Sequence, residues 1–180
     1  MIKLKGYSAS EELFRDLKMI GDLVYYEGSL LSLFSNEKGE LYLYDWSDSD
    51  DKYNRWLVFR VTLPQLLHYL NGNLSHYELI TTEHTDSIYS VDLDNELNYH
   101  NILRLTVDEI PAEYLPKKHV MHDDNESPDI ERIKQFVKEM QDKAYEAREN
   151  KWKNKFPNLL VKPVLALQTK ITGREELMAA

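Results

Sequence analysis

The 180-residue sequence contains no cysteine, which excludes disulfides, thiolate metal sites, iron–sulfur clusters and cysteine nucleophiles. Glycine occurs only six times, and the glycine-rich phosphate loops, the G-x-S-x-G nucleophile motif and the H-E-x-x-H zinc motif are all missing. No stretch approaches the roughly 18 apolar residues of a membrane span, and Met1–Gly6 lacks the apolar core of a targeting signal. We therefore expect a cytoplasmic protein with no membrane partner, and no motif predicts a cofactor.

Charge is distributed unevenly along a chain whose 42% hydrophobic and 29% charged residues indicate a globular protein. The net charge is −9, but residues 1–127 carry 11 basic and 23 acidic groups, whereas residues 128–180 carry 11 and 8. The first part is therefore −12 and the second +3. This asymmetry predicts an acidic body with a basic tail, which either folds back on the body or reaches an acidic partner.

Alternating aromatic and branched residues predict an α+β domain at residues 1–116 with an antiparallel sheet of about five to six strands. The expected strands lie near residues 23–26, 30–34, 40–46, 55–61, 87–93 and 101–107. In the third of these, Leu41 and Leu43 face one side, while Tyr42, Tyr44 and Trp46 face the other. Tyrosines on a strand usually pack with a satisfied hydroxyl, and less often form a ligand platform.

Short helices are expected beside the sheet, because three capping-box patterns predict helix starts. In each pattern a Ser or Thr is followed three positions later by Glu or Gln. The pattern at Ser8 predicts a helix that places Phe14 and Leu17 on one face and ends at Gly21. The patterns at Thr62 and Ser75 predict two short helices over one sheet face.

The C-terminal region is predicted to be a helical arm at residues 128–180, joined by a polar linker at 117–127. Ser127-Pro-Asp suits a helix start. The apolar positions that follow are spaced 3, 4, 3, 4, 3, the seam of a coiled coil or bundle, although less than three heptads long. Trp152 and Phe156 are candidate anchors, followed by a proline-punctuated apolar run. The candidate partner-binding residues are Ile130, Ile133, Val137, Met140, Trp152, Phe156, Leu159 and Leu160.

Acidic and histidine clusters offer the only candidate metal chemistry. The carboxylates of Asp45, Asp48, Asp50 and Asp51 could bind a divalent cation, but their spacing does not fit an EF-hand and favours a solvated hairpin loop. In the predicted linker, His119 and His122 precede two aspartates, and exposed residues are the simpler interpretation. No metal site is predicted.

The basic tail combines cations with two aromatic side chains, which suits either single-stranded nucleic acid or a protein surface. A chain of net charge −9 repels nucleic acid at long range, so protein contact is favoured. Imitation of nucleic acid by the acidic body remains a minor alternative, because its charges form no regular row.

Residues 25–80 carry a pattern of motifs that resembles an uncharacterised family of small bacterial domains. The motifs are Tyr25-Tyr-Glu-Gly-Ser-Leu-Leu31, Leu41-Tyr-Leu-Tyr-Asp-Trp46, Arg55-Trp-Leu-Val-Phe-Arg-Val61 and Leu66-Leu-His-Tyr-Leu-Asn-Gly72. The resemblance covers about residues 1–110 and implies a bacterial or phage source and an α+β fold. It implies no activity and no functional residues, and residues after 127 lie outside it.

These observations favour a non-catalytic interaction or regulatory module of a bacterial system, with a phage-related or defence system among the options. Residues 128–180 would bind a protein partner or a second copy of the chain. The alternative is a metal-dependent hydrolase acting on a nucleotide or nucleic acid, in which the fold joins Asp45, Asp48 and Asp50 to a histidine.

Overall fold

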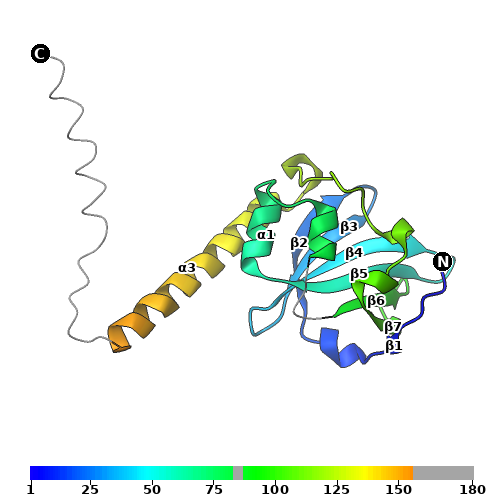
Figure 1. The fold of residues 1–180 in the computed structure, drawn as a ribbon, viewed down its shortest axis with the longest axis horizontal. Coiled ribbons are helices and arrows are strands. Elements are labelled where there is room, and N and C mark those ends of the chain that lie inside the picture. Colours follow the sequence, from blue (N-terminus) through cyan, green and yellow to red (C-terminus); the bar gives the residue numbers. More distant parts are fainter. Residues whose placement is uncertain (83–86, 156–180) are drawn as a thin grey trace, which may run out of the picture. The chain divides into compact units, whose positions relative to one another are not determined.

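The computed structural model describes residues 1–82 and 87–155, and within them the chain forms one seven-stranded antiparallel sheet (Figure 1). The strand order is β1-β7-β6-β5-β4-β3-β2, so β2 to β7 follow the chain as a meander and β1 pairs with β7 at the far edge. The α+β architecture is thus confirmed, with seven strands rather than five or six. The strands are β1 (Tyr7–Ser8), β2 (Lys18–Tyr25), β3 (Ser29–Ser35), β4 (Leu41–Ser49), β5 (Asn54–Val61), β6 (Ile88–Leu93) and β7 (Tyr99–Leu105).

The helix predicted from Ser8 is wrong, because the chain makes only one 3₁₀ turn there, η1 (Glu11–Phe14). Ser10, not Ser8, caps this turn by accepting a hydrogen bond from the N–H of Glu12 at 3.2 Å. Phe14 is 3% exposed and packs on the sheet, and β2 starts only four residues later. Tertiary packing of one aromatic side chain therefore outweighs the local helical pattern.

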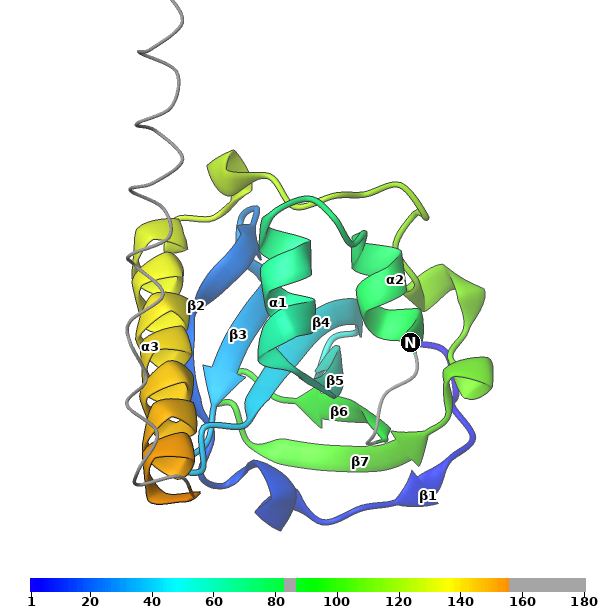
Figure 2. The same ribbon diagram turned by 60° about the vertical axis from the view of Figure 1, so that its left-hand side comes forward.

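The two helices predicted from capping boxes are both present. They are α1 (Leu63–Leu70) and α2 (His76–Thr81), and in each case both reciprocal hydrogen bonds of the box are formed. Gly72, after α1, has φ of 65°, which suits glycine at a helix C-terminus. Figure 2 shows both helices on the same face of the sheet. That face is apolar, and the strand register places Leu33, Leu43 and Phe59 side by side, each fully buried.

The opposite face of the sheet carries an aromatic cluster covered by η1. Phe14 stacks on Tyr99 with ring centroids 5.6 Å apart, and packs edge-on against Tyr89 at 5.5 Å. Tyr44 joins the same cluster, and its hydroxyl lies 2.9 Å from that of Tyr99. Burial raises the pKa of Tyr44 far above its ordinary value. Tyr42 and Tyr44 therefore pack under the N-terminal segment, as the usual behaviour of strand tyrosines indicates.

After β7 the chain continues through 3₁₀ turns η2 (Val107–Glu109), η3 (Ala112–Tyr114) and η4 (Asp124–Glu126), followed by helix α3 (Ile130–Lys155). Residues 117–127, predicted as a linker, belong to a compact unit that extends from Met1 to Lys138. The predicted domain boundary at residue 116 lies inside this unit. A second unit begins at Glu139 within α3.

Candidate functional site

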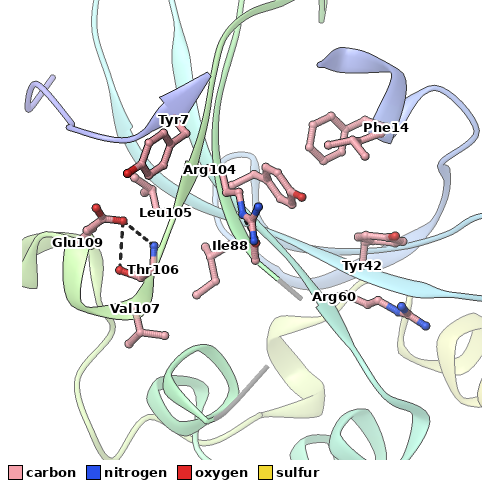
Figure 3. Close-up of a pocket in the computed structure, with 13 residues that line it drawn as sticks. Tyr7, Phe14, Tyr42, Arg60, Ile88, Arg104, Leu105, Thr106, Val107 and Glu109 are labelled. Carbon is pink, nitrogen blue, oxygen red and sulfur yellow. Dashed lines mark hydrogen bonds between the residues drawn. The ribbon is translucent and has the colours of Figure 1, made fainter. Parts of the chain in front are cut away.

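A pocket of about 1020 Å³ lies at one end of the sheet and is lined by residues of η1, η2 and the five strands β1, β4, β5, β6 and β7 (Figure 3). Its walls combine aromatic rings with two guanidinium groups. The residues that define its chemistry are Tyr7, Phe14, Tyr42, Arg60, Tyr89 and Arg104. Ligand sites typically have volumes of about 300–1,000 Å³ and few polar groups, so this pocket has the size and composition of a ligand site.

Cross-strand register places the central cation of the pocket between two tyrosines. Arg104 of β7 pairs with Tyr7 of β1 on one side and with Tyr89 of β6 on the other. Residues directly opposite in antiparallel strands project to the same face, about 5 Å apart. The Nε of Arg104 donates a hydrogen bond to the Ser87 hydroxyl, which orients the guanidinium. The result is a phenol–guanidinium–phenol row across three strands.

A second cation lines the same pocket from β5, with β6 between it and Arg104. Arg60 of β5 pairs with Tyr42 of β4, and its guanidinium is 3.1 Å from the Glu40 carboxylate. Glu109 is the only acidic residue in the described lining, and its carboxylate accepts hydrogen bonds from the N–H and hydroxyl of Thr106, at 2.8 and 3.1 Å. The described lining therefore has more cationic than anionic groups, in a chain of net charge −9.

A second polar cluster lies under α1 and α2. Asp45 and His76 are both buried, with Oδ2 and Nε2 3.3 Å apart but without hydrogen-bond geometry. The ring of Tyr69 lies between two imidazoles, 6.1 Å from His76 and 5.2 Å from His122. Burial, followed by the charges of Asp45 and Glu126, raises the pKa of Tyr69. These groups are enclosed, so the cluster has no route for a substrate among the described residues.

The side chain of His122 is buried, although the sequence predicted an exposed linker residue. Its side chain is 1% exposed, and Nδ1 is buried without a hydrogen-bond partner. Nε2 lies 3.1 Å from Oδ1 of Asp124, whose other oxygen binds Lys134. Burial lowers the pKa of His122. His119 is exposed as expected, so the two histidines do not share an environment.

A buried ion pair joins β5 to β6. Arg55 donates to both carboxylate oxygens of Asp92, from Nε at 2.7 Å and from Nη2 at 2.8 Å. Asp92 is fully buried and also accepts from the amide of Asn101 at 3.0 Å. Tyr114 lies beside Arg55 and donates its hydroxyl to Asp48 at 2.7 Å, which lowers the pKa of Asp48. Each group is engaged within the protein, so this network is structural.

The carboxylates considered for metal binding have separate partners. Asp45 faces His76, Asp48 accepts from Tyr114, and Asp50 accepts the N–H groups of Lys52 and Tyr53 in the β4–β5 turn. Within residues 1–82 and 87–155, no group of three or more histidine and carboxylate side chains is placed to hold a metal ion. The geometry therefore gives no support to the metal-dependent hydrolase.

The candidate partner-binding residues are placed in three different settings. Ile133 and Val137 are 0% and 3% exposed within the Met1–Lys138 unit, and Ile130 and Met140 are half-buried. Trp152 is 64% exposed. Phe156, Leu159 and Leu160 lie outside the described residues. Ile133 and Val137 therefore reach a partner only if they leave the core of this unit.

Sequence reasoning did not identify the pocket residues as a site. Tyr7, Tyr89 and Arg104 are far apart in the chain, and only strand pairing brings them together. The available signal was the single arginine in the seventh strand, flanked by apolar neighbours at positions 103 and 105. It becomes informative only once its two neighbouring strands are known.

In the described part, no helix is long and apolar enough to cross a membrane.

Comparisons with known proteins extend the resemblance along the chain. No curated protein and no solved structure matches this sequence. Residues 10–168 match DUF6575, a family of unknown function, which confirms the expected membership of an uncharacterised family. The expectation that the family does not extend beyond residue 127 is wrong, because the match continues to residue 168. The chain therefore belongs to the DUF6575 family.

Proposed function

We propose that this protein is a non-catalytic interaction module of a bacterial cytoplasmic system, and that the part of α3 after Lys138 binds a second copy of the chain. The observation that carries this proposal is the exposure of that segment. Between Glu139 and Trp152 every side chain except the half-buried Met140 is exposed. Helices in proteins gain most of their stability from packing of one face, so a segment with side chains this exposed is suited to packing against a partner.

Two aromatic residues on the exposed segment suit a protein interface. Tyr145 and Trp152 are seven residues apart, which places them on the same side of the helix, and they are 66% and 64% exposed. Tyrosine and tryptophan are among the residues that dominate binding energy at interfaces. The half-buried Met140 precedes Ala144 and Ala147 on another stripe of the helix, where small residues permit close approach.

Charge supports a second copy as the partner. Residues 1–127 carry −12 and residues 128–180 carry +3. The basic segment of one copy is thus complementary to the acidic residues of another, and such complementarity accelerates and orients association. Exposed charges are screened over about 8 Å at physiological salt, so this association should weaken as salt increases.

Light scattering after size exclusion tests the proposal on the full chain at several protein and salt concentrations. We expect an oligomer at low salt, and a monomer for the double variant Tyr145→Ser/Trp152→Ser. The matched control Gln141→Ser/Asn150→Ser changes two exposed neutral residues of the same segment and should behave as the wild type. A wild-type chain that is monomeric under all conditions contradicts self-association. Capture of one protein by the wild type but not by Tyr145→Ser/Trp152→Ser would then identify a different partner.

A further inference from the structure

The pocket at the end of the sheet has features that structural packing alone does not require. Tyr7 is 78% exposed and Leu13 is 51% exposed, although both line a concave surface. Arg104 is also exposed and stands between the rings of two strands. In Figure 3 its guanidinium lies centrally among the labelled side chains. An aromatic surface with a central cation is therefore open to solvent.

We propose that this pocket binds a planar ring that carries a phosphate, which is the chemistry of a nucleoside monophosphate. The proposal is independent of the interaction proposed for α3, because all the residues that carry it lie between Tyr7 and Glu109. It assigns the tyrosines to the ring and the arginines to the phosphate.

The ring subsite rests on Tyr7 and Tyr89. They flank Arg104 on the same sheet face, and among the described residues neither hydroxyl forms a hydrogen bond. Tyr44, in the interior of the same face, differs because its hydroxyl is paired with that of Tyr99. Base–aromatic stacking contributes about 1–3 kcal/mol per base and tolerates any base. The exposed ring of Tyr7 and the half-buried ring of Tyr89 therefore favour a flat ring without selecting its identity.

The phosphate subsite rests on Arg104 and Arg60. Ser87 engages only the Nε of Arg104, so the two terminal nitrogens of its guanidinium are left for two parallel hydrogen bonds to a phosphate. Arg60 is 38% exposed in its side chain and is paired with the half-buried Glu40. Arg60 lies on β5, with β6 between it and Arg104, and adds a second positive charge to the lining of the same pocket.

Size and net charge favour a small ligand over a nucleic-acid strand. The volume of about 1020 Å³ accommodates a mononucleotide. A strand would extend beyond the pocket over a protein of net charge −9, which repels a polyanion. A free nucleotide and the terminal nucleotide of a strand share the same chemistry, and direct titration separates them.

Isothermal titration of the full chain with adenosine monophosphate tests the proposal, with adenosine, inorganic phosphate and a short single-stranded oligoadenylate as further probes. We expect adenosine monophosphate to bind, and each fragment to bind at least about tenfold more weakly, because each occupies one subsite. The oligoadenylate should bind no more tightly than the mononucleotide. Tighter binding of the oligoadenylate would overturn the assignment to a small ligand, and equal affinity for inorganic phosphate would overturn the ring subsite.

Variants locate the binding in this pocket. Arg104→Gln should weaken adenosine monophosphate roughly tenfold, the loss typical of a hydrogen bond to a charged group. Tyr7→Ser should weaken it about fivefold through lost stacking, and its exposed position makes unfolding no concern. The control Arg148→Gln removes an exposed arginine outside the pocket and should bind as the wild type. No binding by the wild type, or equal affinity in Arg104→Gln with an unchanged melting temperature, would overturn the proposal.

Discussion

The carboxylate of Asp129 accepts a hydrogen bond from the backbone N–H of Asp22 at 2.9 Å, which joins the start of α3 to the edge strand β2. Ser127 adds a second contact, because its hydroxyl donates a hydrogen bond to the backbone carbonyl of Asp22 at 2.5 Å. An edge strand presents unpaired backbone groups that invite association with other chains. At Asp22 the side chains of Asp129 and Ser127 bind the backbone N–H and carbonyl that a neighbouring strand would otherwise bind.

Replacing Asp129 with alanine should destabilise the protein by about 1–3 kcal/mol, the cost of leaving a buried N–H without a partner. Asp129→Asn retains an acceptor oxygen and should lose less. Urea denaturation measures the free energy of unfolding, and hydrogen exchange measures the protection of the Asp22 amide. Unchanged protection of that amide in Asp129→Ala would contradict the role of this side chain.

Gly21 shows how the same contact misled the sequence prediction. Its position after an apolar helical pattern indicated a helix stop, but it lies within β2, where an added Cβ would be 2.6 Å from the Cβ of Asp129. The local signals at Thr62 and Ser75 predicted their helices correctly, because both partners of a capping box lie within four residues. Gly21 depends on a residue more than a hundred positions away, and Ser127 likewise contacts β2 as a donor to Asp22.

The pocket was beyond sequence reasoning for a related reason. The alternation of residues predicted the faces of individual strands, including the aromatic face of β4. It did not predict that the two-residue strand β1 pairs with β7, which places Tyr7 beside Arg104. Strand order depends on which segments cover which face of the sheet. The aromatic face is covered by η1, where the sequence wrongly predicted a helix.

The buried pair of Arg55 and Asp92 should show strong non-additivity. Removing one partner leaves an unpaired buried charge, which typically costs about 3–5 kcal/mol. Arg55→Met and Asp92→Leu should therefore each be strongly destabilising, while the double variant should lose less than the sum of the two.

Urea denaturation of the two single variants and the double variant measures this coupling. Arg15→Met is the matched control, because Arg15 pairs with Glu12 at 3.8 Å on the surface and both side chains are more than two-thirds exposed. The control should change the free energy of unfolding by less than about 1 kcal/mol. Additive losses at Arg55 and Asp92 would contradict a coupled pair.

His122 should make stability depend on pH near neutrality. Burial lowers its pKa in the folded protein below the ordinary value of 6.5, while Asp124 and Asp123 oppose that shift and Lys134 adds to it. As pH falls through 6.5, the unfolded chain takes up a proton that the folded protein does not, so unfolding is favoured. The contribution is complete above pH 6.5 and is lost between 6.5 and the lower folded pKa.

The free energy of unfolding, measured by urea denaturation between pH 5 and 8, should therefore fall toward acid. His122→Phe retains a ring against Tyr69 and should remove this part of the pH dependence. The carboxyl groups of Asp48, Asp94 and Asp124, whose pKa values lie below the usual 3.8, lose their contributions only at lower pH. An identical slope between pH 5 and 7 in wild type and His122→Phe would contradict the assignment.

Substitutions along α3 should separate its packed start from its exposed continuation. Ile133 is fully buried in the Met1–Lys138 unit, so Ile133→Ala should cost about 2–5 kcal/mol through lost burial and the cavity left behind. Tyr145→Ala, on the exposed part of the same helix, should change stability by no more than about 0.5 kcal/mol. Chemical denaturation of both variants, monitored by circular dichroism at low protein concentration, makes the comparison. Equal losses at the two positions would show that the helix packs along its whole length, and the proposed use of Tyr145 and Trp152 for a partner would then fail.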